Sequence, residues 1–151
     1  MAEGRPTPHV VVIGAGAAGS LSALHLGRHA RRRGTALDVT LLDPAPYRAR
    51  GTAFGTTDAQ HLLNVPASGM SALPEDPGHF VAWRAQHHPD LLGEPGVFAP
   101  REQFGRYLDE TLGAAYGDDL PLGLRHARVR AVGIRRVGEG MCVETGDGAE
   151  V

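Results

Sequence analysis

The sequence predicts an α/β domain built around a short parallel β-sheet, and three observations near its start carry that prediction. An uninterrupted run of β-branched residues, Val10 to Ile13, leads directly into a Gly-x-Gly-x-x-Gly pattern at residues 14–19. A helical stretch follows. After it, a second β-rich run extends from Leu37 to Asp43 and ends in that acid. A strand, a glycine turn, a helix and a second strand that ends in an acid are typical of a dinucleotide-binding βαβ unit.

Each glycine of the pattern answers a steric requirement. Gly14 allows a tight turn, Gly16 lets the backbone approach a pyrophosphate, and Gly19 lets the helix pack closely on the strand. The free N–H groups and the positive dipole end of the helix then suit phosphates. Asp43 lies where an acid accepts hydrogen bonds from an adenosine ribose. The pattern therefore predicts a dinucleotide site, and a glycine-rich turn in an unrelated α/β protein is the alternative.

The helix is predicted over residues 17–33. Leu21 and Leu24 recur at helical spacing, arginines gather at the negative end of the helix, and Gly34 is placed to end it. A solvated, dipole-matched terminus is the simplest interpretation of these arginines. A contact with a 2′-phosphate is disfavoured because Asp43 would repel that phosphate.

The chain beyond Asp43 departs from a simple NAD-binding domain, which would continue with another helix and a third parallel strand. Residues 44–58 are rich in turn formers and show no sustained period. Two helices are predicted within a helical insertion of about residues 75–116. The first starts at Asp76-Pro77 and ends near His88, and the second covers 101–116.

The remaining residues are β-like. Partial alternation and two Gly-containing turns predict an antiparallel β meander over about residues 125–148. The sequence then stops on the threshold of another strand, so we expect a sheet that is incomplete at the C-terminus. An unfinished sheet leaves an exposed edge and apolar surface, which predicts self-association.

Composition excludes several classes of function. Cys142 is the single cysteine, which permits no intramolecular disulfide and favours a reducing compartment. A formal net charge of −2 gives no reason to expect a nucleic-acid partner, and no apolar run is long enough to cross a membrane. His87, His88 and Asp90 predict no metal site, because adjacent helical residues point about 100° apart. We expect a cytoplasmic protein that acts on a small molecule of unknown identity.

Three segments resemble a known family. They are residues 51–56 (GTAFGT), 60–67 (QHLLNVPA) and 98–108 (FAPREQFGRYL). They are similar to the signature of the FAD/NAD(P)-binding proteins within the flavoproteins that have two dinucleotide-binding domains. The resemblance covers nearly the whole chain, and the layout is more distantly similar to the amine N-hydroxylating flavin monooxygenases.

The resemblance implies a Rossmann-like, three-layer FAD-binding domain. Family members are longer and continue into a second glycine turn that closes over FAD and into an NADPH-binding insertion. The chain is thus expected to be the N-terminal, FAD-binding portion of an NAD(P)H-dependent oxidoreductase of the monooxygenase kind, and to be inactive without the remainder.

The resemblance also implies site residues. The glycine turn and the acid are implied as FAD ligands, with their neighbours lining the same groove: Gly14, Ala15, Gly16, Ala17, Ala18, Gly19, Asp43 and Pro44. The loop that passes along the flavin is matched by Arg50, Gln60, Leu62 and Asn64. These loop residues alternatively satisfy only backbone groups of their own loop.

No residue is a convincing catalytic acid, base or nucleophile. His61 could carry a proton near the flavin because imidazole titrates near neutral pH, but a packed, hydrogen-bonded histidine is the favoured interpretation. Three alternatives stay open for the chain: an NAD(P)-dependent Rossmann dehydrogenase domain, a non-catalytic nucleotide-binding module, and an incomplete product that holds no cofactor.

Overall fold

A computed structural model describes residues 6–88, 96–117 and 121–151. Its first unit consists of strand β1 (His9–Ile13), helix α1 (Ala17–Arg33) and strand β2 (Leu37–Leu42), with the two strands parallel. The predicted bounds of the helix are confirmed, whereas the second strand ends one residue before the acid. β2 is central and buried on both faces, while β1 lies at the edge and is only half-buried.

A third parallel strand, β3 (Leu122–Ala127), pairs with β2 and gives the sheet order β1-β2-β3. Two predictions are therefore wrong: the chain does return to a third parallel strand, and residues 125–127 belong to it rather than to an antiparallel meander. The physical reason is that alternation identifies a strand without identifying its partner. Leu124 lies opposite Val39, whose side chain is buried in the core beneath α1.

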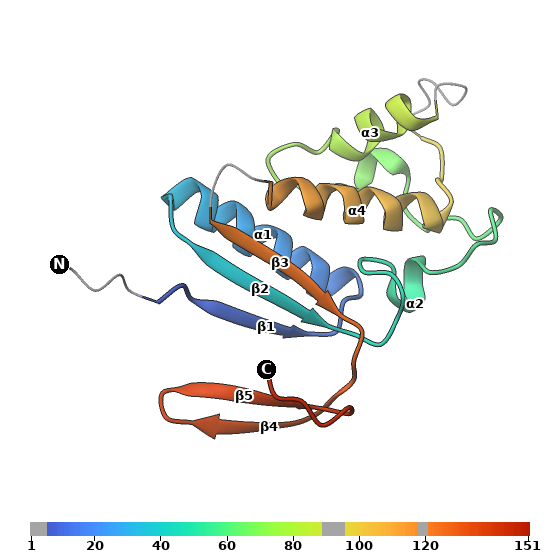
Figure 1. Cartoon of the computed structure of the whole chain (residues 1–151). Coiled ribbons are helices and arrows are strands. Elements are labelled where there is room, and N and C mark those ends of the chain that lie inside the picture. The colour runs from blue at the N-terminus through green and yellow to red at the C-terminus, as the bar shows by residue number, and fades with distance from the viewer. Residues whose placement is uncertain (1–5, 89–95, 118–120) are drawn as a thin grey trace.

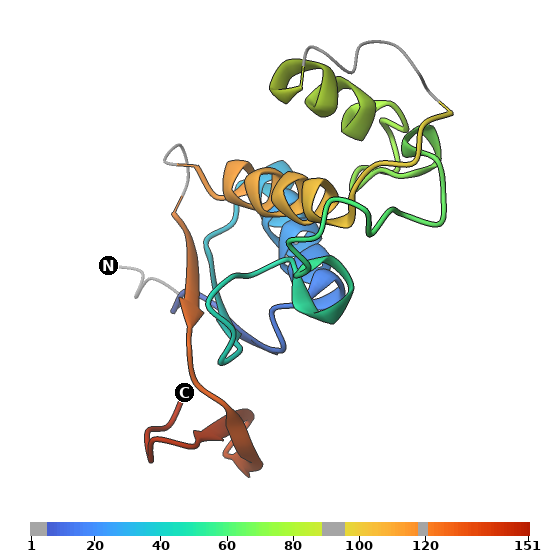
Figure 2. The same ribbon diagram turned by 90° about the vertical axis from the view of Figure 1, so that its right-hand side faces the viewer.

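The crossover from β2 to β3 contains the other helices. They are α2 (Gly51–Phe54), a 3₁₀ turn η1 (Ala67–Gly69), α3 (His79–His87) and α4 (Arg101–Ala115). Figures 1 and 2 show α1 and α4 side by side over one face of the parallel sheet. A short βα crossover is thus replaced by a long one that ends in α4.

Helix α3 starts later than predicted. The expected start at Asp76-Pro77 is wrong, because the N–H of Asp76 donates to the Leu73 carbonyl and the N–H of His79 donates to the Asp76 carbonyl, which forms a turn before the helix. Asp90, considered above with the neighbouring histidines, lies outside the described residues.

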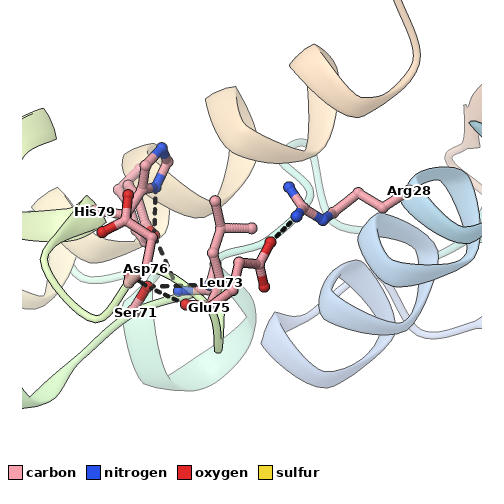
Figure 3. Close-up of polar contacts among 8 residues, drawn as sticks. Arg28, Ser71, Leu73, Glu75, Asp76 and His79 are labelled. Carbon is pink, nitrogen blue, oxygen red and sulfur yellow. Dashed lines mark hydrogen bonds and ion pairs between the residues drawn. The ribbon is translucent and has the colours of Figure 1, made fainter. Parts of the chain in front are cut away.

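The segment before α3 is tied to both long helices, as Figure 3 shows. Arg28 of α1 forms an ion pair with Glu75, and the Ser71 hydroxyl donates to the Asp76 carbonyl at 2.7 Å. The fully buried Tyr107 of α4 accepts a hydrogen bond from the Ala72 N–H at 2.9 Å. These contacts fix the crossover against the helical layer.

The last part of the chain forms an antiparallel pair, β4 (Ala131–Val137) and β5 (Gly140–Thr145). Val151 pairs with Val143 of β5 through two backbone hydrogen bonds of 2.8 and 3.0 Å, beside an isolated bridge between Glu144 and Glu150. A cavity of about 590 Å³ lies between the helix-free face of the parallel sheet and the C-terminal Glu150 and Val151. Helices, a parallel sheet and an antiparallel pair confirm the predicted α/β fold class (Figure 1).

Within the described ranges, no helix combines the length and the apolar character that crossing a membrane requires.

Candidate functional site

The glycine turn between β1 and α1 is closed by backbone contacts. The N–H of Gly14, whose φ is 97°, donates to the Leu42 carbonyl at 2.8 Å and so joins the turn to β2. A Cβ added at Gly19 would lie 1.9 Å from the Gly14 carbonyl oxygen. Only glycine therefore allows the helix to begin this close to the strand.

The N-terminus of α1 carries no compensating negative group of its own. Gly16 is the N-cap residue, it makes no side-chain capping bond, and the first turn of the helix contains no acid. The first N–H groups of a helix lack partners within the helix, and its dipole end is positive. This end of α1 is therefore suited to an anion.

Asp43 is fixed beside the glycine turn. One carboxylate oxygen accepts a hydrogen bond from the Ala15 N–H and the other accepts one from the Ala45 N–H, both at 2.8 Å. An ionised carboxylate has about four acceptor positions, so acceptor capacity remains for the hydroxyl groups of a ribose. Nε2 of His126 lies 3.1 Å from the Asp43 carbonyl oxygen, so the backbone of Asp43 is held as well as its carboxylate.

A second wall comes from the crossover. Residues 49–51 lie against the glycine turn so closely that a Cβ added at Gly51 would be 3.1 Å from the Cα of Gly16. The glycine turn, Arg50 and α2 together line an open cavity of about 320 Å³. It is lined by Ile13, Gly14, Gly16, Ala17, Ala18, Gly19, Arg50, Gly51, Thr52 and Ala53.

Arg50 supplies the charge of this cavity. Its guanidinium carbon lies 4.5 Å from the centre of the Tyr47 ring, within the range of a cation–π contact. Its Nε is buried and has no hydrogen-bond partner among the described residues. Because Arg50 is a cation in a lining that contains no acid, the charge of the cavity suits an anionic ligand.

An adjoining hollow of about 360 Å³ extends from the first cavity across Thr52 and Ala53, which line both. Its other lining residues are Thr56, His61, Leu62 and Arg101. Arg101, the first residue of α4, donates from Nε to the Leu62 carbonyl at 3.0 Å and so holds this loop.

His61 is exposed, and its Nδ1 lies 2.7 Å from the Thr56 hydroxyl. The expectation of a packed histidine is wrong, although the expected hydrogen bond is present. The reason is that the neighbouring Leu63 turns inward while His61 faces out of the loop.

The predicted site residues are brought together only in part. Most of the glycine turn and Arg50 line one cavity, Ala15 is buried beside it, and Leu62 lines the adjoining hollow. Asp43 lines neither cavity but is bonded to Ala15 beside the glycine turn. Three others line neither cavity and are exposed: Pro44, Gln60 and Asn64.

Sequence reasoning did not assign site roles to Gly51, Thr52, Ala53 or His126. The first three belong to the GTAFGT segment that carried the resemblance, which was the available signal. His126 lay in a run assigned to the meander. Within the described part of the chain, no group of three His, Cys, Asp or Glu residues could hold a metal ion.

The parallel βαβ unit, the glycine turn and the acid after β2 define a dinucleotide-binding domain of the Rossmann type. The family model described as FAD-NAD(P)-binding matches residues 11–151, and the chain belongs to that family. No curated protein sequence matches the chain.

Solved structures share the fold. A double mutant of a flavin monooxygenase from Stenotrophomonas maltophilia aligns with a TM-score of 0.57 and 24% identity over 97% of this chain and 36% of its own. Lysine monooxygenase NbtG from Nocardia farcinica aligns at 0.54 and 17% identity over 95% of this chain and 41% of its own. The Diels-Alderase PyrE3 of pyrroindomycin biosynthesis aligns at 0.52 and 16% identity, over 96% and 30%. The chain thus spans well under half the length of these structures.

Proposed function

We propose that this chain is the FAD-binding portion of an NAD(P)H-dependent flavin oxidoreductase of the monooxygenase kind. The observation that carries the proposal is the cavity that both the N-terminus of α1 and Arg50 line, with no acid among its lining residues. Two positive features and no acid in one cavity suit a pyrophosphate, which carries a negative charge on each phosphate.

The residues of the chain divide the work of binding. Backbone N–H groups at the start of α1 and the guanidinium of Arg50 would hold the pyrophosphate, and Asp43 would accept hydrogen bonds from the adenosine ribose. The adjoining hollow beside Leu62 would take the next part of the ligand. When bound, FAD supplies the capacity to accept a hydride and pass electrons on, and the protein supplies its position and surroundings.

The choice of FAD over NAD rests on the crossover rather than on the sheet. The third parallel strand, β3, removes one objection to a dehydrogenase domain, because such a domain also has it. FAD is supported by the segments that resemble flavoproteins and by the flavin monooxygenases among the structures with this fold. NAD(P)H dependence, the small-molecule substrate and a cytoplasmic location concern the whole protein and belong to the proposal.

The test is retention of flavin. The chain is purified with excess FAD, free cofactor is removed by gel filtration, and the visible spectrum of the protein peak is recorded for the wild type and for Gly16→Asp. A Cβ at Gly16 would meet its nearest atom at 3.6 Å, an ordinary contact, so the variant should fold. Its carboxylate would occupy the anion position at the start of α1. The matched control is Gly96→Asp, at an exposed position where a Cβ meets no described atom within 4 Å.

We expect a flavin band with the wild type and Gly96→Asp and none with Gly16→Asp. Addition of NADPH to the coloured protein would then separate a competent enzyme portion from a non-catalytic module. A folded, colourless wild type that retains NAD or NADP⁺ would instead favour the dehydrogenase alternative and overturn the proposal.

A further inference from the structure

The side chain of Ser20 joins the two walls of the cavity from beneath. It lies in the first turns of α1 and is 1% exposed. Its hydroxyl donates to the Ala15 carbonyl at 3.1 Å and accepts from the Ala49 N–H at 3.0 Å. A serine hydroxyl has one donor and can also accept. Here the O–H donates to the glycine turn, and the oxygen accepts from the crossover.

Ala49 is the residue that this arrangement holds. It is fully buried, and its φ of 65° is in the left-handed region that residues with a Cβ rarely adopt. Its N–H also donates to the Ala15 carbonyl at 2.7 Å. A conformation of this kind persists only where the surroundings hold it, and here two acceptors on the glycine-turn side do so.

Ala49 directly precedes Arg50, the charged residue of the cavity lining. Arg50 follows Ala49 in sequence, its stem lies near Gly105 of α4, and its guanidinium packs over Tyr47. The backbone direction at Ala49 therefore sets where the Arg50 side chain leaves the chain, beside the cavity that Arg50 and the start of α1 both line.

We propose that Ser20 is a positioning residue of the dinucleotide site, which acts by holding the Ala49 N–H and thereby placing Arg50 against the pyrophosphate. This inference rests on the proposed function, since it needs an anionic dinucleotide in the cavity. The Ser20 side chain does not line the cavity. A substitution of Ser20 should therefore change FAD binding only when Arg50 is present, whereas it should change the stability of the fold with or without Arg50.

The experiment is a double-mutant cycle with FAD titrated by calorimetry into the wild type, Ser20→Ala, Arg50→Gln and the double variant. Loss of one net hydrogen bond predicts that Ser20→Ala weakens FAD binding between about three- and tenfold. In the Arg50→Gln background the same substitution should change the dissociation constant little, while it should lower Tm equally in both backgrounds. Ser22→Ala is the matched control, because the exposed Ser22 hydroxyl bonds only to the Ala18 carbonyl of its own helix at 3.0 Å.

Each result is decisive. An effect on FAD affinity that vanishes without Arg50 supports the positioning role, whereas an equal effect in both backgrounds, or none, overturns it. If Ser20→Ala fails to fold, Ser20→Cys keeps the volume and weakens both hydrogen bonds, and it enters the same cycle. A wild type that binds no FAD contradicts the proposed function itself, and a wild type that binds FAD as tightly as Ser20→Ala contradicts the positioning role alone.

Discussion

The two walls of the cavity are built differently. The glycine-turn wall is held by the sheet, with Gly14 bonded to Leu42 and Ala15 bonded to the carboxylate of Asp43. The opposite wall, α2 and the loop through residue 64, is mostly exposed, and many of its polar contacts stay within the loop. The difference indicates that the glycine-turn wall is fixed by the fold, whereas the position of the opposite wall depends on a few contacts such as that of Arg101 with the Leu62 carbonyl. In the proposed function the first wall would hold the pyrophosphate and the second would face the flavin.

The largest effect is expected from a substitution in the glycine-turn wall. Gly19→Ala places a Cβ against a backbone oxygen that cannot move without opening the turn, so we expect a loss of about 3 kcal/mol in the free energy of unfolding and loss of FAD binding. Urea denaturation followed by circular dichroism measures the loss. Gly96→Ala, with open space among the described residues, is the control and should change stability little. Equal stability of the two variants would contradict the packing argument.

The next effect concerns the contact between α1 and the end of α4. A Cβ at Gly27 would lie 2.6 Å from the Tyr116 ring, whose hydroxyl donates to the Ala23 carbonyl at 2.7 Å. We expect Gly27→Ala to cost about 1–2 kcal/mol of stability. The cost should disappear in a Tyr116→Ala background, where the ring is absent. A cost that persists there would mean that the ring is not its cause.

Tyr116 also predicts a pH dependence. Burial raises the pKa of its hydroxyl to about 12 from the ordinary 10.0. The folded state therefore keeps a proton that the unfolded state loses, so this contribution to stability is complete below pH 10 and declines as the pH rises towards 12. Urea unfolding of the wild type and Tyr116→Phe should show a stability difference that narrows above pH 10. A difference that stays constant over this range would contradict the assignment.

A smaller effect is expected in the loop wall, where a change should alter the binding of FAD but not that of ADP. Gln60 and Asn64 are exposed and line neither cavity, so replacing both with Ala should alter stability by less than about 0.5 kcal/mol. If they contact the flavin, FAD binding weakens roughly three- to tenfold while ADP binding is unchanged. Calorimetric titration with both ligands measures this, and Gln86→Ala on an exposed position of α3 is the control. Unchanged FAD affinity would mean that the two side chains serve only their own loop.

The smallest expected effect concerns self-association through β4 and β5, which contribute no residue to either cavity. Four large apolar side chains of the β4–β5 pair are 49–63% exposed: Val132, Ile134, Val137 and Met141. We predict concentration-dependent self-association, measured by sedimentation velocity. Ile134→Lys with Met141→Lys should weaken it, whereas the exposed control pair Thr57→Lys and Ser68→Lys, which adds the same charge, should not. A wild type that stays monomeric at all concentrations would contradict the prediction.

The parts that were predicted well are those in which local chemistry decides the structure. The β1–α1–β2 unit follows from β-branched runs, a helical period and glycines with specific steric roles. The register of β3 did not follow, because its partner β2 lies about eighty residues earlier and alternation does not name a partner. Arg50 follows a left-handed Ala49 whose N–H is bonded to the buried Ser20, and no local pattern signals such a long-range hydrogen bond. The family resemblance, rather than periodicity, marked Arg50 as a candidate.

The most direct test of the account is a calorimetric titration of FAD into the wild type and Arg50→Gln, with Arg136→Gln as the control. Arg136 is exposed on β4 and lines neither cavity, so its loss removes the same charge without changing the lining of the site. We expect Arg50→Gln to weaken FAD binding roughly tenfold or more, as for a lost charge-assisted hydrogen bond, and Arg136→Gln to bind FAD as the wild type does. Equal affinity of the wild type and Arg50→Gln for FAD would contradict the claim that Arg50 and the N-terminus of α1 together hold the pyrophosphate.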